Sequence, residues 1–305
     1  MRLALLVTTC VLAATSAGCS EEERDQPPVA APSSRHTTSS SSSPLASSTT
    51  TVLGSPADVE PPRNARDATA RITTIERALR DPATRLDELP ALGWEQQAVY
   101  RALAEDEALR DAVVPAVPDD VALVVAANTG GNTAIATLLE PPETLPGSWR
   151  IVEPAPPDVL LGFYREAEAA SGIPWPYLAA INLVETRMGR IAGDSTAGAQ
   201  GPMQFIPSSW AAFGEGGDVH DPRDAILAAG RYLAAAGGPD EMYSALFAYN
   251  HADAYVDAVS RYASVMAADE RAFLGYYHWQ VSYRTVDGLY LLPEGYPEVD
   301  AVRIG

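Results

Sequence analysis

The sequence predicts a mainly helical protein that ends in a small β-hairpin. Three observations support this fold class. Apolar residues recur at helical spacing through most of residues 63–270, Pro and Gly punctuate that region at helix-length intervals, and alternating apolar residues are confined to the C-terminal part. Apolar residues make up 47% of the 305 residues, which is enough to bury a core.

The chain begins with the features of a secretory signal peptide. A positive start at Met1–Arg2 precedes a largely apolar run, Leu3–Ala14. Those residues would span about 18 Å as a helix, well short of the roughly 30 Å core of a bilayer. We therefore expect residues 1–18 to be a cleaved leader rather than a stable membrane span.

The end of this leader resembles a bacterial lipoprotein processing box, Ser16-Ala17-Gly18-Cys19, although such boxes usually have a larger aliphatic residue in place of Ser16. The resemblance implies that Cys19 is lipidated and anchors the protein to the membrane outside the cytoplasm. Cleavage and release into the cell wall is the alternative. Cys10 lies within the leader, so the folded part has no further cysteine for a disulfide or a metal site.

Residues 19–62 form a linker that begins at Cys19. From Ser33 to Thr51, 14 of 19 residues are Ser or Thr. Such a segment buries too little apolar surface to offset its ordering entropy, so we expect a disordered tether with a reach of roughly 35 Å.

Residues 63–150 are predicted to form a helical N-terminal domain. Apolar residues mark one face of a helix over Arg66–Arg80, and a second helix is expected around Trp94–Ala108. Val117–Leu139 predicts one or two more, with Gly130-Gly131 as a weak point or break. We expect this domain to brace the segment that follows it, residues 151–270, or to dock a protein partner.

Residues 151–270 are predicted to form the catalytic domain, and residues 271–305 a C-terminal extension. The expected helices of the catalytic domain span residues 156–171, 174–188, 221–236, 240–248 and 252–268. Asp221 precedes Pro222 at a helix start, which is typical of an N-cap. Alternation from Gln280 to Leu292 around Asp287-Gly288 predicts the hairpin.

Composition excludes several classes of function. The chain has no lysine, which excludes phosphate loops of the Walker type, Schiff-base chemistry and Ser–Lys dyads. Its 40 acidic residues against 21 basic ones argue against a nucleic-acid partner, since such binding relies on Lys and Arg neutralising phosphates.

Glu185 is the candidate catalytic residue. It lies near the end of a mostly apolar helix, where partial desolvation should raise the pKa of its carboxyl toward that of a general acid at neutral pH. The alternative is a surface glutamate beside Arg187. Glycines in the stretch 189–204 would let the backbone approach a ligand closely. Tyr249 offers an aromatic ring on which a sugar can stack, and Asn250 offers an amide that can bond its hydroxyl or N-acetyl groups, so these segments together suit a sugar-binding site.

These pieces occur in the order found in lytic transglycosylases, the peptidoglycan-cleaving enzymes with a lysozyme-like fold. The resemblance covers about residues 158–265, and the Val-Glu-Thr and Gln-Phe-x-Pro-Ser-Ser runs look most like the membrane-bound B type. The matching segments are Val184–Thr186, Ser195–Gly201, Met203–Trp210, Asp221–Ile226 and Ala248–Asn250.

The resemblance implies a mechanism with one carboxylate. Glu185 would protonate the oxygen between N-acetylmuramic acid and N-acetylglucosamine, then act as base while the muramic 6-hydroxyl closes a 1,6-anhydro ring. A hydrolysing muramidase, which needs a second carboxylate, is the alternative enzyme. The alternative of another class is a non-catalytic lipoprotein that binds peptidoglycan.

The resemblance also implies the binding residues. Ser195 and Gln204 would hold the reacting sugar or its N-acetyl group, and Tyr249 and Asn250 would contact substrate. Met203 and Phe205 would line the cleft, with core packing as their alternative, and helix capping is the alternative for Asn250.

No cofactor and no metal are expected. The stretch 214–220 replaces a calcium loop that B-type enzymes can carry, and it offers few oxygen ligands. Candidates for a second carboxylate are Asp194, Glu215, Asp218 and Asp221, of which Asp221 fits an N-cap better and the other three are expected to face solvent.

Overall fold

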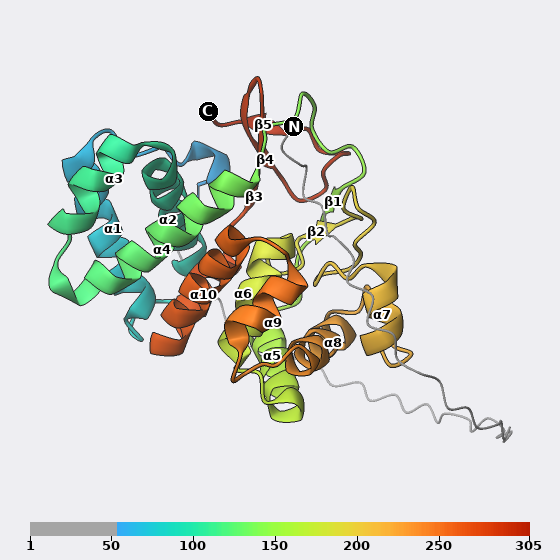
Figure 1. Ribbon diagram of the computed structural model, residues 1–305. Coiled ribbons are helices and arrows are strands. Elements are labelled where there is room, and N and C mark those ends of the chain that lie inside the picture. The colour runs from blue at the N-terminus through green and yellow to red at the C-terminus, as the bar shows by residue number, and fades with distance from the viewer. Residues whose placement is uncertain (1–53) are drawn as a thin grey trace, which may run out of the picture. The chain divides into compact units, whose positions relative to one another are not determined.

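Helices make up most of the part of the chain that the computed structural model describes, residues 54–305 (Figure 1). The mainly helical fold with a small C-terminal sheet is confirmed. The α helices are α1 (Ala65–Arg80), α2 (Leu89–Glu105), α3 (Glu107–Val113), α4 (Asp119–Leu138), α5 (Pro157–Ser171), α6 (Trp175–Thr186), α7 (Pro207–Phe213), α8 (Pro222–Ala235), α9 (Met242–Tyr249), α10 (Asp253–Ala268) and α11 (Ala272–Tyr277). Two 3-10 turns, η1 (Pro56–Asp58) and η2 (Val114–Ala116), complete the helical elements in this range. The predicted leader, Cys19 and residues 19–53 of the predicted linker lie outside the described residues, and the described end of that linker contains η1 and is therefore ordered.

Local sequence signals set several helix ends. The side chain of Asn64 accepts the backbone N–H of Asp67 at 3.0 Å and so caps α1. Asp221 caps α8 in the same way, accepting from the N–H of Asp224 at 3.0 Å, which confirms its predicted role. Gly172 ends α5 in the left-handed conformation, with φ 77°, as the sequence predicts.

The glycine pair in α4 does not break the helix, so the segment forms one helix, which is one of the two predicted alternatives. A Cβ at Gly130 would lie 2.7 Å from the guanidinium of Arg261, and one at Gly131 would lie 2.9 Å from the ring of Tyr262. Both glycines therefore let α10 approach α4 closely. By length and hydropathy alone α4 could span a membrane, but it packs against α10 and α2 and buries the polar Asn128.

Helix α10 is the centre of the helical packing. It lies between α4 and α6 (Figure 1), and the largest hydrophobic cluster among the described residues joins residues of α1 to α4 with residues of α5 to α11. A buried polar network crosses the same region: Gln96 donates to Glu76 at 3.0 Å, and Trp279 donates to Gln96 at 2.9 Å. The boundaries at residues 150 and 270 thus fall within one shared core, and their status as domain boundaries stays a prediction.

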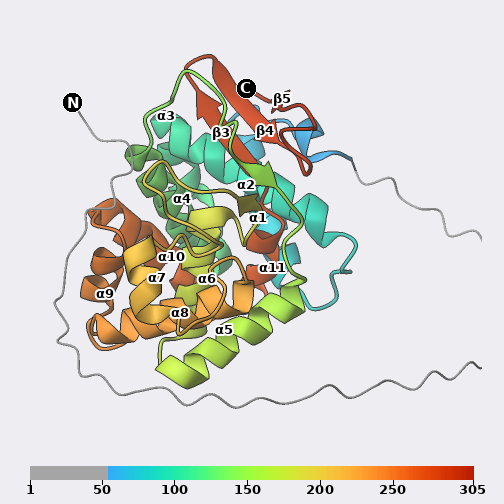
Figure 2. The same cartoon turned by 90° about the vertical axis from the view of Figure 1, so that its right-hand side faces the viewer.

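The strands are short and form two small sheets. β1 (Arg150–Ile151) pairs with β2 (Ile191–Ala192) and so joins the segment before α5 to the loop after α6. β3 (Val281–Thr285), β4 (Gly288–Leu292) and β5 (Val302–Arg303) form an antiparallel sheet in the order β3-β4-β5 (Figures 1 and 2). The backbone N–H of Ile151 in β1 donates to the carbonyl of Tyr296, just after β4, at 3.1 Å. The predicted hairpin is therefore present.

Candidate active site

Glu185 is the second-last residue of α6 and its carboxylate is half-buried. Tyr255 of α10 donates its hydroxyl to Glu185 Oε1 at 2.8 Å. Burial raises the pKa of Glu185 to about 7, and the hydrogen bond from Tyr255 opposes that rise. At neutral pH the carboxyl is therefore divided between its acid and base forms, as an acid–base catalyst requires.

Glu185 is half-buried, which disfavours the alternative of a surface glutamate, and it forms no salt bridge with the nearby Arg187. The Arg187 guanidinium instead donates to the backbone carbonyl of Leu183 at 2.8 Å. Arg187, Met188 and Gly189 have φ values of 54°, 63° and 89°, which ends α6 abruptly and turns the chain into β2. This turn leaves the carboxylate of Glu185 at the end of a rigid helix.

A buried hydrogen-bond network fixes the following loop to α6. Thr186 Oγ1 donates to the carbonyl of Pro202 at 2.6 Å, and Asn182 Nδ2 donates to the same oxygen at 2.8 Å. Tyr164 of α5 donates to Asn182 Oδ1 at 2.7 Å and orients that amide. The loop that carries Gln204 is thus held in register with the helix that carries Glu185.

Ser195 organises the loop itself. Its Oγ accepts the backbone N–H groups of Ala197 at 3.2 Å and Ala199 at 3.0 Å. The predicted contact between Ser195 and a sugar would therefore use the Ser195 hydroxyl as the hydrogen-bond donor. Gly201, expected to let the backbone approach a ligand, instead approaches its own chain: a Cβ there would lie 1.8 Å from the carbonyl oxygen of Val219.

Gln204 has a left-handed backbone, with φ 51°. Its Nε2 lies 3.0 Å from the carbonyl oxygen of Gly201 and 3.4 Å from that of Gly193. Backbone hydrogen bonds of 2.9 Å in both directions between Gln200 and Phe205 close the turn beneath it. The side-chain amide is therefore fixed across the loop.

Met203 and Phe205 are buried, which corrects the expectation that they line the cleft and favours the core-packing alternative. The Phe205 ring packs edge-on against Tyr249, with ring centroids 6.0 Å apart. The Met203 carbonyl accepts the Tyr249 hydroxyl at 2.6 Å. Both residues thus act on the site by holding Tyr249.

Tyr249 and Asn250 end α9 beside this loop. Burial and the nearby charge of Glu185 raise the pKa of Tyr249 well above its usual range, so the two side chains lie in one electrostatic neighbourhood. The backbone of Asn250 caps α9, its N–H donating to Leu246 at 3.0 Å. The half-buried Asn250 amide makes no hydrogen bond to any residue within 54–305, so capping and substrate contact are compatible.

Tyr255 is the functional residue that sequence reasoning missed. It is 1% exposed and lies in the first turn of α10, 70 residues from Glu185. The sequence held one local indication of Tyr255: it lies in the first turn of the helix that follows the Tyr249-Asn250 break, on the buried face of that helix. The partnership with Glu185 arises only from the packing of α10 on α6.

The other acidic candidates are occupied elsewhere. Asp194 and Asp218 are exposed. Asp194 accepts a hydrogen bond from the side-chain amide of Gln200 at 3.4 Å, and Asp218 accepts one from the backbone N–H of His220 at 2.9 Å. Glu215 pairs with Arg231 at 3.3 Å. Among the described residues no carboxylate contributes to the raised pKa of Glu185, and no cluster of three or more metal-binding side chains forms.

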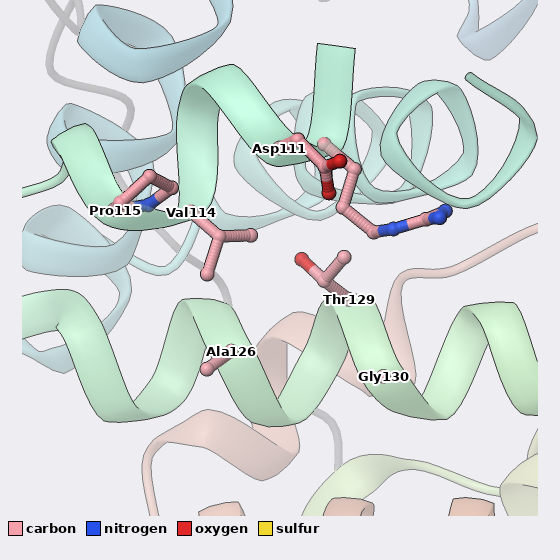
Figure 3. A pocket seen from close by; sticks show the side chains of 7 residues that line it. Asp111, Val114, Pro115, Ala126, Thr129 and Gly130 are labelled. Carbon is pink, nitrogen blue, oxygen red and sulfur yellow. The ribbon is translucent and has the colours of Figure 1, made fainter. Parts of the chain in front are cut away.

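A cavity of about 440 Å³ lies elsewhere, between α3, η2 and α4 (Figure 3). Arg110, Asp111 and Thr129 supply its polar groups. Arg110 is engaged in capping α2 through the carbonyl of Leu103 at 3.2 Å. No residue of α5 to α10 lines this cavity, so it does not belong to the site around Glu185.

Comparison with known proteins agrees with the resemblance in the sequence. Residues 163–271, which include Glu185, Gln204 and Tyr255, match the family model described as the transglycosylase SLT domain. Membrane-bound lytic murein transglycosylase F of Thiobacillus denitrificans is 30% identical over 118 residues, covering 36% of this chain and 25% of that protein. The chain thus spans about a quarter of the length of this relative, and no solved structure matches. The likeness to the B type stays a prediction.

Proposed function

With the transglycosylase SLT domain match as premise, we propose that this protein is a peptidoglycan lytic transglycosylase. It cleaves the β-1,4 bond between N-acetylmuramic acid and N-acetylglucosamine and leaves 1,6-anhydro-muramyl ends. The observation that carries the proposal is Glu185, a half-buried carboxyl with a pKa of about 7 that accepts a hydrogen bond from Tyr255. A group in this state can give a proton and take it back within one turnover.

Glu185 acts twice in the proposed reaction. As an acid it protonates the bridging oxygen while the bond from that oxygen to the muramic anomeric carbon breaks. The substrate's own acetamido group stabilises the developing positive charge. As a base Glu185 then takes the proton of the muramic 6-hydroxyl as its oxygen bonds to the anomeric carbon, and no water is consumed.

The surrounding residues hold substrate and catalyst in register. Gln204 and Asn250 offer amides to the N-acetyl and hydroxyl groups, and Tyr249 borders the same space. Ser195 contributes mainly by shaping the loop, since its oxygen accepts two backbone N–H groups. Tyr255 orients Glu185 and supports its charged form during the second step.

The cell envelope is the proposed location. Cys19 is the proposed lipid anchor, and residues 19–62 would tether the enzyme within reach of the wall. Residues 151–270 are the proposed catalytic unit. The helices of residues 63–150 brace it where α4 meets α10, and their remaining surface is a candidate for a cell-wall protein partner.

Digestion of purified peptidoglycan, followed by mass spectrometry of the released muropeptides, tests the proposal. The full chain should release anhydro-muramyl products, and Glu185→Gln should release none. Glu215→Gln, which changes an exposed carboxylate between α7 and α8, serves as a matched control and should remain active. Products with reducing-end muramic acid would identify a hydrolase, and absence of any product would favour a binding protein.

A further inference from the structure

Two aromatic side chains outside the matched domain meet beside the loop after Glu185. Trp149 lies just before β1, and Tyr283 lies on β3 of the C-terminal sheet. Their rings pack edge-to-face, with centroids 5.4 Å apart and planes at 84°. Both residues are half-buried, so each is anchored in the fold while part of its surface faces solvent.

Trp149 is in direct contact with the loop that carries Gln204. A Cβ at Gly193 would lie 3.2 Å from both the Cα and the Cδ1 of Trp149. The carbonyl of the same Gly193 lies 3.4 Å from the side-chain amide nitrogen of Gln204. Gly193 thus lies between Trp149 and the side-chain amide of Gln204, which is proposed to bind substrate.

The pair is held rigidly. Pairing of β1 with β2, with Ile151 opposite Ile191, fixes Trp149 to the loop. Backbone pairing of β3 with β4 fixes Tyr283, which also packs on the small core beneath the sheet. Rings that are ordered before binding lose little conformational entropy when a ligand arrives.

We propose that Trp149 and Tyr283 form an additional glycan subsite that stacks one N-acetylated sugar ring beyond the ring held at Gln204. A pyranose has an apolar C–H face and a polar rim, which suits an aromatic surface next to hydrogen-bonding groups. The C-terminal extension thus supplies half of a binding surface, which gives the sheet a role in selecting longer glycans. This inference rests on the proposed function.

Oligosaccharide binding as a function of length tests the subsite. The parent is the full chain with Glu185→Gln, which prevents turnover, and the probes are N-acetylglucosamine oligomers of two and six sugars, measured by titration calorimetry. The parent should bind the hexamer more tightly than the dimer. Trp149→Ala should weaken hexamer binding about tenfold, equivalent to about 1.4 kcal/mol, and leave dimer binding within about twofold, whereas Trp149→Phe should retain most of the affinity.

Tyr290→Ala is the matched control, because it removes an aromatic ring from the same sheet that makes no ring contact with Trp149. It should leave hexamer affinity unchanged. An equal loss in Tyr290→Ala and Trp149→Ala would assign the pair a structural role and overturn the subsite.

Two other results would also overturn it. If the parent binds the hexamer and Trp149→Ala binds it equally well, the subsite is wrong and the proposed function stands. If the parent binds neither oligomer, the subsite as stated is wrong, and the peptidoglycan digestion decides separately whether the proposed function survives.

Discussion

Replacement of Tyr255 by Phe should move the pH dependence of catalysis in a defined direction. The substitution removes one hydroxyl from a buried ring and leaves its packing on α10 in place. The lost hydrogen bond, 2.8 Å long, now favours the charged form of Glu185. Its removal leaves burial unopposed, so the pKa of Glu185 should rise above its present value of about 7.

The size of the effect follows from the strength of such bonds. A hydrogen bond to a charged group contributes about 1.5–3 kcal/mol. At about 1.36 kcal/mol for each pH unit, its loss should move the ionisation by about one to two pH units. Glu185 must be protonated to act first as an acid, so kcat/KM of the native enzyme should fall as pH rises above the pKa of Glu185. In Tyr255→Phe this fall should occur at a pH that is higher by the same one to two units.

The assay is the initial rate of peptidoglycan clearance between pH 5 and pH 9. Well below pH 7, Glu185 is protonated both in the native enzyme and in Tyr255→Phe. The variant should still be about tenfold slower there, because the carboxyl of Glu185 is less well oriented without the Tyr255 hydroxyl. Tyr262→Phe, a buried tyrosine of the same helix that does not contact Glu185, is the control and should match the native profile. An unshifted alkaline limb in Tyr255→Phe would refute the assigned link between the two residues.

Three further predictions concern stability. Burial raises the pKa of Glu185 from 4.5 to about 7. The contribution of the protonated carboxyl to folding is therefore full below about pH 4.5 and is lost as pH rises through 7. At about 1.36 kcal/mol per pH unit, Glu185→Gln should unfold with a free energy about 3 kcal/mol higher than that of the native protein at pH 8, and about equal to it at pH 4, as measured by urea titration. Gly201→Ala should lower the free energy of unfolding by more than about 3 kcal/mol, because its Cβ would lie 1.8 Å from a backbone carbonyl oxygen. Gly198→Ala, which has a similar φ but open space around its Cβ, should lower it by only about 1–2 kcal/mol. Equal losses in the two variants would contradict the steric explanation. Gly131→Ala should lower the melting temperature, because its Cβ would lie 2.9 Å from an aromatic ring of α10. Gly162→Ala should raise the melting temperature, because its Cβ meets nothing within 4 Å and alanine favours the helical conformation of α5. A higher melting temperature in both variants would show that α4 and α10 can separate without cost.

Local physical signals account for what the sequence predicts correctly. Helix starts follow from side chains that accept unpaired N–H groups, as at Asp221, and the end of α5 follows from the left-handed freedom of Gly172. The placement of Glu185 on an apolar helix is also local, because it follows from the apolar residues of the same segment. These signals need no knowledge of distant contacts.

Other features depend on neighbours that no local pattern reveals. Gly130 and Gly131 weaken a helix by propensity, yet α4 is continuous because they are the points where α10 comes close. Met203 and Phe205 belong to a motif for a sugar site, but the fold directs both side chains into the core. Gly201 faces the backbone at Val219 and not a ligand.

The sequence by itself determined the helical class, most helix ends, the C-terminal hairpin and the candidate acid, because each follows from interactions within a few residues along the chain. Only the tertiary structure decided how that acid is tuned, since the hydroxyl of Tyr255 arrives from 70 residues away on α10. It likewise decided that Trp149 and Tyr283, 134 positions apart, meet beside the site. Burial and hydrogen bonding depend on which surfaces pack together, and that is a property of the whole fold.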